Sequence, residues 1–190
     1  KELAAKSGFE LVNIGVERLP PVAIVDGAIM DSGAVIDAIQ RLFQQQKIKS
    51  ANICTGVSGN AVIVKKISLP QMSPEELSES IHWEAEQYIP FDINEVNIDH
   101  QILRESGVDG QMDVLLVAAK KDLIDDYVSV ITESGLTLVC MDVDAFAVGN
   151  MYQHNYQPSD ETTVALLDLG ASVINMNVMN GSVPVFTRDI

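Results

Sequence analysis

The sequence predicts an α/β protein, because apolar runs with strand periodicity alternate with amphipathic helical stretches along the chain. The stretch 164–190 alternates with period two and contains Asn180-Gly181, the dipeptide most typical of a tight hairpin. The stretch 33–47 instead repeats its apolar side chains at helical spacing. Strands and helices that alternate in this way need each other to bury their apolar faces, so the mixed class follows.

The composition is that of a folded, acidic protein. Hydrophobic residues make up 47% of the 190 residues, which excludes a disordered chain. A net charge of −15 without a basic patch argues against nucleic-acid binding and against adsorption to anionic lipid. No apolar run is long enough to span a bilayer, so membrane contact is expected only through partners. Cys54 and Cys140 lie far apart in apolar segments and are expected to be buried, reduced thiols.

The first sixty residues predict a strand-rich segment with one helix. Pro20-Pro21 ends a strand pattern because proline cannot donate to a sheet ladder, and Asp26-Gly27 predicts a tight turn. Asp31 and Ser32 both suit a helix N-cap. In chain order, we expect strands over 1–6, 9–19, 22–30 and 48–56, with a helix over 33–47 before the last of them.

The middle of the chain has the order strand, helix, strand, strand, helix, strand, which is typical of a split βαβ unit. Ser73 predicts a helix start with a capping box, and Pro74 suits the first helical position. The expected elements are 61–69, 74–88, 95–104, 113–119, 120–134 and 136–141. We therefore expect an inserted α/β module over 61–141, within a larger domain built from 1–60 and 142–190.

A candidate phosphate-binding turn lies within 164–190, where Asp168 precedes Gly170-Ala171-Ser172. Without a Cβ at Gly170, a ligand can approach the backbone, whose N–H groups and the Ser172 hydroxyl can face a phosphate. Asp168 can hold a hydrated Mg²⁺. An ordinary β-hairpin, in which Asp168 bonds the turn amides, explains the same residues, and the local residues alone favour it.

No set of side chains typical of catalysis is present. His82 and Glu86 have metal-ligand spacing on a helix, but no third ligand is evident. The histidines are scattered, and neither a Walker A motif nor a dinucleotide-binding glycine motif occurs. These observations weigh against an enzyme.

Several segments together resemble the PilM family of type IV pilus assembly proteins, which are actin-like ATPases related to the division protein FtsA. The most specific is EAEQYIPF at 84–91. The matching segments are 19–43, 57–70, 82–103, 141–152 and 164–172. The resemblance implies part of an actin-like ATPase fold, which is ribonuclease H-like, and it implies that the inserted module corresponds to the subdomain called 1C.

The resemblance also implies ATP and Mg²⁺ between two lobes, clamped by two glycine-rich hairpins. Asp168, Gly170, Ala171 and Ser172 match the second hairpin. The first hairpin should precede Lys1 and the second lobe should follow Ile190. We therefore expect this chain to be part of a longer protein, to hold about half of an ATP site and to bind nucleotide weakly or not at all.

Family members bind the N-terminal cytoplasmic tail of the membrane protein PilN in a groove beside the 1C-like module. The candidates to line it are Tyr88, Ile89, Pro90 and Phe91 with the helix before them, although holding the module on the main domain would explain these residues equally well. The implied function is a nucleotide-controlled adaptor for pilus biogenesis and twitching motility. It would lie in the cytoplasm, peripheral to the bacterial inner membrane, and contact other pilus platform proteins and further copies of itself.

Two alternatives share the fold. A sugar or metabolite kinase needs a catalytic carboxylate in a substrate cleft, for which Asp168 is the one candidate, and its position suits Mg²⁺ better. A division protein like FtsA would carry a C-terminal amphipathic membrane helix, and a sequence that is expected to be part of a longer protein leaves this alternative open.

Overall fold

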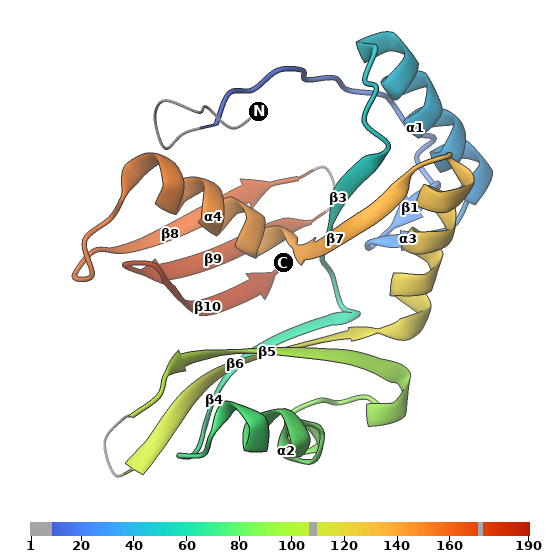
Figure 1. Ribbon diagram of the computed structural model, residues 1–190. Helices are drawn as coiled ribbons and strands as arrows, with labels where there is room; N and C mark the ends of the chain where they lie inside the picture. Colours follow the sequence, from blue (N-terminus) through green and yellow to red (C-terminus); the bar gives the residue numbers. More distant parts are fainter. Residues whose placement is uncertain (1–8, 107–109, 171–172) are drawn as a thin grey trace.

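The computed structural model describes residues 9–106, 110–170 and 173–190, so the predicted strand over 1–6 lies outside it. Its elements form an upper body and, below it in Figure 1, a module built from β4, β5, β6 and α2. In the described residues, no helix is long and apolar enough to cross a bilayer.

The elements are β1 (Ile24–Val25), β2 (Ala28–Ile29), α1 (Ser32–Gln46), β3 (Asn52–Val57), β4 (Val62–Pro70), α2 (Pro74–Glu86), the 3-10 turn η1 (Ile93–Glu95), β5 (Val96–Arg104), β6 (Gln111–Lys120), α3 (Lys121–Glu133), β7 (Thr137–Val143), α4 (Asp144–Tyr156), β8 (Thr163–Leu169), β9 (Ile174–Asn180) and β10 (Val183–Asp189).

The tight turn between β1 and β2 is confirmed. Asp26 and Gly27 both have positive φ, at 49° and 82°, as a type I′ hairpin requires. Asp31 is the N-cap of α1, and its side chain accepts a hydrogen bond from the Ala34 N–H at 3.0 Å. Ala23, Val35 and Val130 form a small buried cluster that joins this hairpin to α1 and α3.

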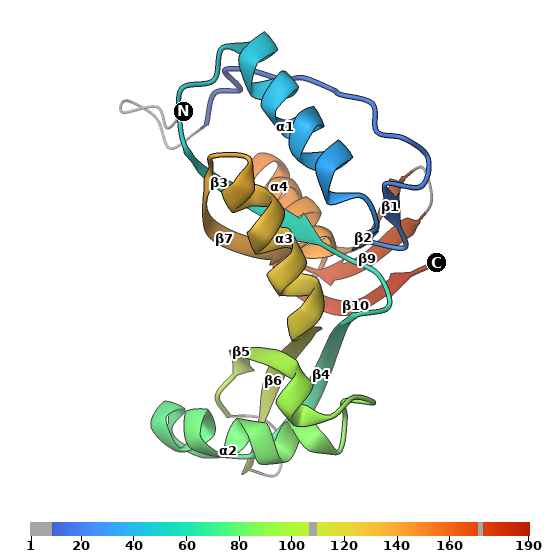
Figure 2. The same ribbon diagram turned by 90° about the vertical axis from the view of Figure 1, so that its right-hand side faces the viewer.

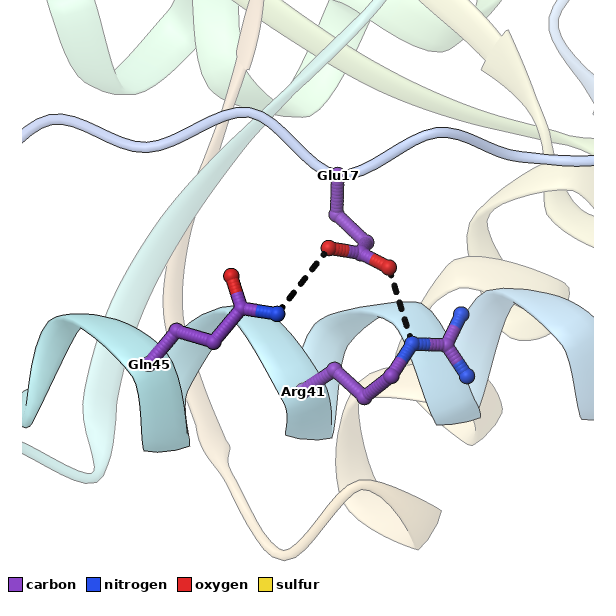
Figure 3. A network of polar contacts seen from close by, with 3 residues as sticks. All are labelled: Glu17, Arg41 and Gln45. Atoms are coloured by element: carbon purple, nitrogen blue, oxygen red, sulfur yellow. Dashed lines mark hydrogen bonds and ion pairs between the residues drawn. The ribbon is translucent and has the colours of Figure 1, made fainter.

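The strand predicted over 9–19 is wrong. Phe9 forms an isolated bridge, and residues 10–19 form no ladder with any described strand. The segment instead runs extended beside α1, where Glu17 accepts hydrogen bonds from Arg41 at 2.8 Å and Gln45 at 3.5 Å (Figure 3). Period-two alternation does not make a strand when no neighbouring strand offers its backbone groups.

The upper body is built around the parallel pair β3 and β7. In Figures 1 and 2, α4 lies on one side of this pair, and α3 with α1 lies on the other. Gly56 of β3 lies so close to the Asp144 side chain at the start of α4 that a Cβ would overlap it. Gly149 likewise brings α4 against β9, because a Cβ there would lie 3.0 Å from Asn177 Nδ2.

Strands β8, β9 and β10 form an antiparallel meander, as the alternation in 164–190 predicted. The turn is one residue later than predicted, because Asn180 stays in the ladder opposite Thr163 and Val183. The loop is Gly181-Ser182, with positive φ at Gly181 alone, at 58°, which is the pattern of a type II′ turn.

The module is a three-stranded sheet of order β4-β6-β5, with α2 packed on one face. The predicted capping box begins α2: the Glu76 N–H donates to Ser73 Oγ, and the Ser73 N–H donates to Glu76 Oε2. The core between α2 and the sheet contains Leu77, Ile81, Ala85, Val114 and Leu116, all at most 3% exposed.

The last strand of the expected split βαβ unit does not join the module sheet. β7 pairs in parallel with β3 in the upper body, and α3 packs on α1 and β7. The segments that lead into and out of the module lie side by side, because the Lys120 N–H donates a hydrogen bond to the Ala61 carbonyl at 3.1 Å. The division at 61–141 stays a prediction, and this pairing argues for moving its second boundary to about residue 120.

One buried carboxylate makes the stability of the module pH-dependent. Asp113 forms ion pairs with Lys66 at 3.0 Å and Arg104 at 2.8 Å, and it accepts a hydrogen bond from Ser68 Oγ at 3.0 Å. The Lys66 ammonium, together with Ser68 and Arg104, outweighs burial and holds the pKa of Asp113 below its usual 3.8. A depressed pKa stabilises the fold above the unfolded-state pKa, and this contribution is lost as the pH falls through the folded-state value.

We therefore expect Asp113→Asn to lower the urea midpoint at pH 7. The difference in midpoint between the variant and wild type should shrink as the pH falls below about 4. Urea denaturation followed by circular dichroism at pH 7 and pH 3 measures both differences. Asp125→Asn, at an exposed position of α3, is the control and should match wild type at both values. An Asp113→Asn deficit that is equally large at pH 3 would contradict the assignment.

A candidate partner groove and a candidate phosphate turn

The two faces of the module sheet have different neighbours. Along β6, Val114 and Leu116 belong to the core beneath α2, whereas Leu115, Val117 and Ala119 point to the opposite face. That second face is turned toward the upper body (Figure 1). The sheet is therefore apolar on both sides, although α2 covers one side alone.

A cavity of about 400 Å³ lies between this second face and the upper body. Val117 of β6 lines one side of it, and Met141, Val143 and Phe146 of β7 and α4 line the other. Its volume lies within the range of about 300–1,000 Å³ typical of ligand pockets. Two neighbouring cavities share Leu115 with it and continue the hollow toward β10. We call this continuous hollow the partner groove.

The partner groove has charged groups near both ends. Asp99 and Asp142 contribute to the main cavity, and Lys65 and Lys66 line the cavity beside β10. Strand β5 borders the main cavity and pairs only with β6 among the described strands. Its outer edge therefore offers backbone groups to an additional strand. The site can thus bind an extended chain through apolar, charged and backbone contacts.

The four residues predicted to bind a partner lie elsewhere in the module. Ile89 is 5% exposed and belongs to the core beneath α2, with Tyr88 and Phe91 half-buried against the same core. Pro90 is exposed, and the Lys120 ammonium lies 4.7 Å from the centre of the Phe91 ring. None of the four lines the partner groove. Their role in partner binding stays a prediction, whereas their packing role is visible.

The groove residues were missed because both faces of β6 are apolar. The sequence from Val114 to Ala119 is one continuous apolar run. Such a run is typical of a strand covered on both faces, and that signal was available. Which element covers the second face is a tertiary property, because β7 and α4 reach it only after the chain has returned to β3.

The candidate phosphate turn joins β8 to β9. Asp168 is exposed near the end of β8, and it makes no side-chain hydrogen bond to another described residue. The Gly170 N–H donates to the Val173 carbonyl at 3.1 Å, and a Cβ at Gly170 would lie 2.7 Å from that oxygen. The Val173 carbonyl therefore requires a glycine at position 170, while the Asp168 side chain is open to solvent; phosphate and metal binding at this turn stays a prediction. Ala171 and Ser172 lie outside the described residues.

The ends of the meander also contact the loop that leads into the module. Asp189, at the end of β10, accepts hydrogen bonds from the Gly59 N–H and from Asn175 Nδ2, the latter at 2.8 Å. Asn175 lies directly opposite Asp168 in the β8–β9 ladder. One carboxylate thus connects the strands beside the candidate phosphate turn to the β3–β4 loop.

Comparison with known proteins places this geometry in a family. The family model described as type IV pilus assembly protein PilM matches residues 2–190. A solved PilM-PilN type IV pilus biogenesis complex contains a chain that is 28% identical, with a TM-score of 0.81 over 90% of this chain and 52% of that one. The cytoplasmic domain of EpsL, an inner-membrane component of the Vibrio cholerae type II secretion system, is 11% identical, with a TM-score of 0.57 over 82% and 56% of the two chains.

These matches agree with the actin-like ATPase fold predicted from the sequence, and the chain spans about half the length of either solved relative. The family match covers nearly all of the sequence, including the module, the partner groove and the β8–β9 turn. The chain belongs to the PilM family of type IV pilus assembly proteins.

Proposed function

We propose that this chain is the partner-binding part of a type IV pilus adaptor and that its partner groove takes up the N-terminal cytoplasmic tail of a PilN protein. The observation that carries the proposal is the apolar cavity of about 400 Å³ between Val117 and Phe146. The similar solved chain comes from a PilM-PilN complex, which supports the choice of partner.

The groove chemistry suits a short, extended and mainly apolar peptide. Apolar side chains of the peptide fill the space between Val117 and Phe146, while its backbone pairs with the outer edge of β5. Asp99 and Asp142 favour a basic residue or an amino terminus at their end of the groove. The acidic chain, with a net charge of −15, would also attract a basic tail from a distance.

In the intact protein, Asp168, Gly170, Ala171 and Ser172 would hold the phosphates and Mg²⁺ of ATP. A nucleotide bound there would supply negative charge, and this chain would contribute one of the two hairpins that face it. Asp189 offers a physical route to the module, because it joins the strands beside this turn to the β3–β4 loop. Occupancy by nucleotide therefore biases the position of the module and the width of the groove.

The intact protein would then act at the cytoplasmic face of the inner membrane, peripheral to it. PilN crosses the membrane and carries the tail, so membrane contact is made through that partner. Other pilus platform proteins, and further copies of this protein, would contact surfaces outside the groove.

Calorimetric titration of this chain with the synthetic N-terminal cytoplasmic peptide of its PilN tests the proposal. Parallel titrations use a scrambled peptide and Mg-ATP. We expect binding of the authentic peptide, no binding of the scrambled one and little or none of Mg-ATP. Failure of a chain with folded circular dichroism to bind the peptide, together with failure of the full-length protein, would overturn the proposal.

A further inference from the structure

The two cysteines of this protein, which are far apart in the sequence, lie side by side in the fold. Cys54 of β3 and Cys140 of β7 are directly opposite in the parallel ladder, both are exposed and both are free thiols. Residues directly opposite each other in a ladder project to the same face of the sheet. The expectation of two separate, buried thiols is therefore wrong, because this face of the β3–β7 pair is left open near the cysteines.

A β-bulge brings the two residues together. Ile53 lies opposite Leu138, but the next residue, Cys54, lies opposite Cys140, so Val139 is the extra residue in β7. Without the bulge, Cys54 would face Val139. Bulges redirect side chains and recur beside functional sites. Here the irregularity changes the partner of Cys54 from an aliphatic side chain to a second thiol.

The proximity also affects the acidity of Cys140. Partial desolvation, the Cys54 thiol and the Asp142 carboxylate all raise the pKa of Cys140. A raised pKa keeps the Cys140 thiol protonated at neutral pH. Cysteine is among the most buried residue types, so two neighbouring exposed cysteines are an unusual feature of this fold.

We propose that Cys54 and Cys140 form a dithiol modification site that closes reversibly to a disulfide by exchange with a small-molecule disulfide such as oxidised glutathione. The proposal is independent of the peptide and nucleotide functions above. Adjacent strands of a sheet lie about 4.7–4.9 Å apart, which is within the Cα separation that a disulfide spans, about 4.4–6.8 Å. An exposed disulfide of this kind is more easily reduced than a buried structural one.

The exchange balances in two steps. One protein thiolate attacks a sulfur of the small-molecule disulfide, whose S–S bond breaks as a mixed disulfide forms and one small thiolate leaves. The second protein thiol then loses its proton and attacks the protein sulfur of the mixed disulfide, which releases the second small thiolate. Two protein thiols are oxidised to one disulfide, one small-molecule disulfide is reduced, and the two protons end on the released thiols.

The disulfide would close a covalent loop around the whole module. Cys54 precedes β4, and Cys140 follows β6 and α3, so both connections of the module lie within the loop. A long closed loop restricts the unfolded chain most strongly. Oxidation should therefore raise the thermal midpoint by several degrees.

The test is treatment of the full chain with graded ratios of oxidised to reduced glutathione, followed by acid quenching, intact mass and thiol counting in denaturant. We expect wild type to lose both thiols without keeping glutathione and to recover them with dithiothreitol. Cys54→Ser and Cys140→Ser should each keep a stable glutathione adduct instead.

Three results would overturn the proposal. The first is a wild type that stays reduced at glutathione ratios that modify the single variants. The second is a wild type that accumulates glutathione adducts as the single variants do. The third is a wild type whose disulfides join two chains. Non-reducing electrophoresis distinguishes the third result from an intrachain bond.

Discussion

Replacing Leu77 with alanine is expected to lower the free energy of unfolding by about 2–5 kcal/mol, the largest stability effect that the fold predicts. Leu77 is fully buried on the inner face of α2, where it packs in the same cluster as Leu116 of β6. Truncation removes apolar contacts and leaves a cavity that a three-stranded sheet with one covering helix cannot easily close. Urea denaturation followed by circular dichroism measures the loss.

Glu79→Ala on the same helix is the matched control. Glu79 is exposed, and the substitution exchanges one good helix former for another, so the free energy of unfolding should change by no more than about 0.5 kcal/mol. If Leu77→Ala matched this control, α2 would not be packed on the sheet as described.

Replacing Val117 with glutamate is expected to weaken binding of the PilN peptide by about 30-fold or more, which is roughly 2 kcal/mol. Val117 is half-buried on the groove face of β6, so the new carboxylate would enter the apolar cavity beside Asp99. An apolar side chain of the peptide would then lose its pocket. This expectation rests on the proposed function, and the same calorimetric titration measures it.

Trp83→Ala is the control for this experiment. Trp83 is 78% exposed on α2, which covers the face of the sheet opposite the groove, and its loss should leave peptide affinity unchanged. Circular dichroism of both variants must match wild type. If Trp83→Ala abolished binding while Val117→Glu preserved it, the partner site would lie on the outer side of α2 and not in the groove.

Local signals in the sequence predicted local structure well. The Asp26-Gly27 turn and the capping box at Ser73 depend on residues within a few positions of each other, and both are present. The alternation along β9 also held, although its buried face carries Asn175 and Asn177. Asn177 Nδ2 donates a hydrogen bond to the Ala145 carbonyl at 2.7 Å, and no sequence pattern specifies this partner.

The errors come from interactions between distant segments. Residues 9–19 have the composition of a strand but no partner strand among the described residues. The pairing of β7 with β3 and the bulge at Val139 put Cys54 opposite Cys140, and neither follows from periodicity. The partner groove likewise depends on how the module sheet meets α4. For the candidate phosphate turn, the local residues suggested Asp168 and Gly170 and the family resemblance suggested the chemistry, and the phosphate-binding role stays a prediction.

The hydrogen bond between Lys120 and Ala61 has a consequence for the evolution of this architecture. A segment whose two ends touch can be gained or lost as one piece, because the host chain needs only a short bridge to continue from β3 to α3. The module can therefore vary in sequence or be exchanged between relatives while the parallel pair beneath it keeps its geometry. The module surface can diversify in this way without rebuilding the upper body.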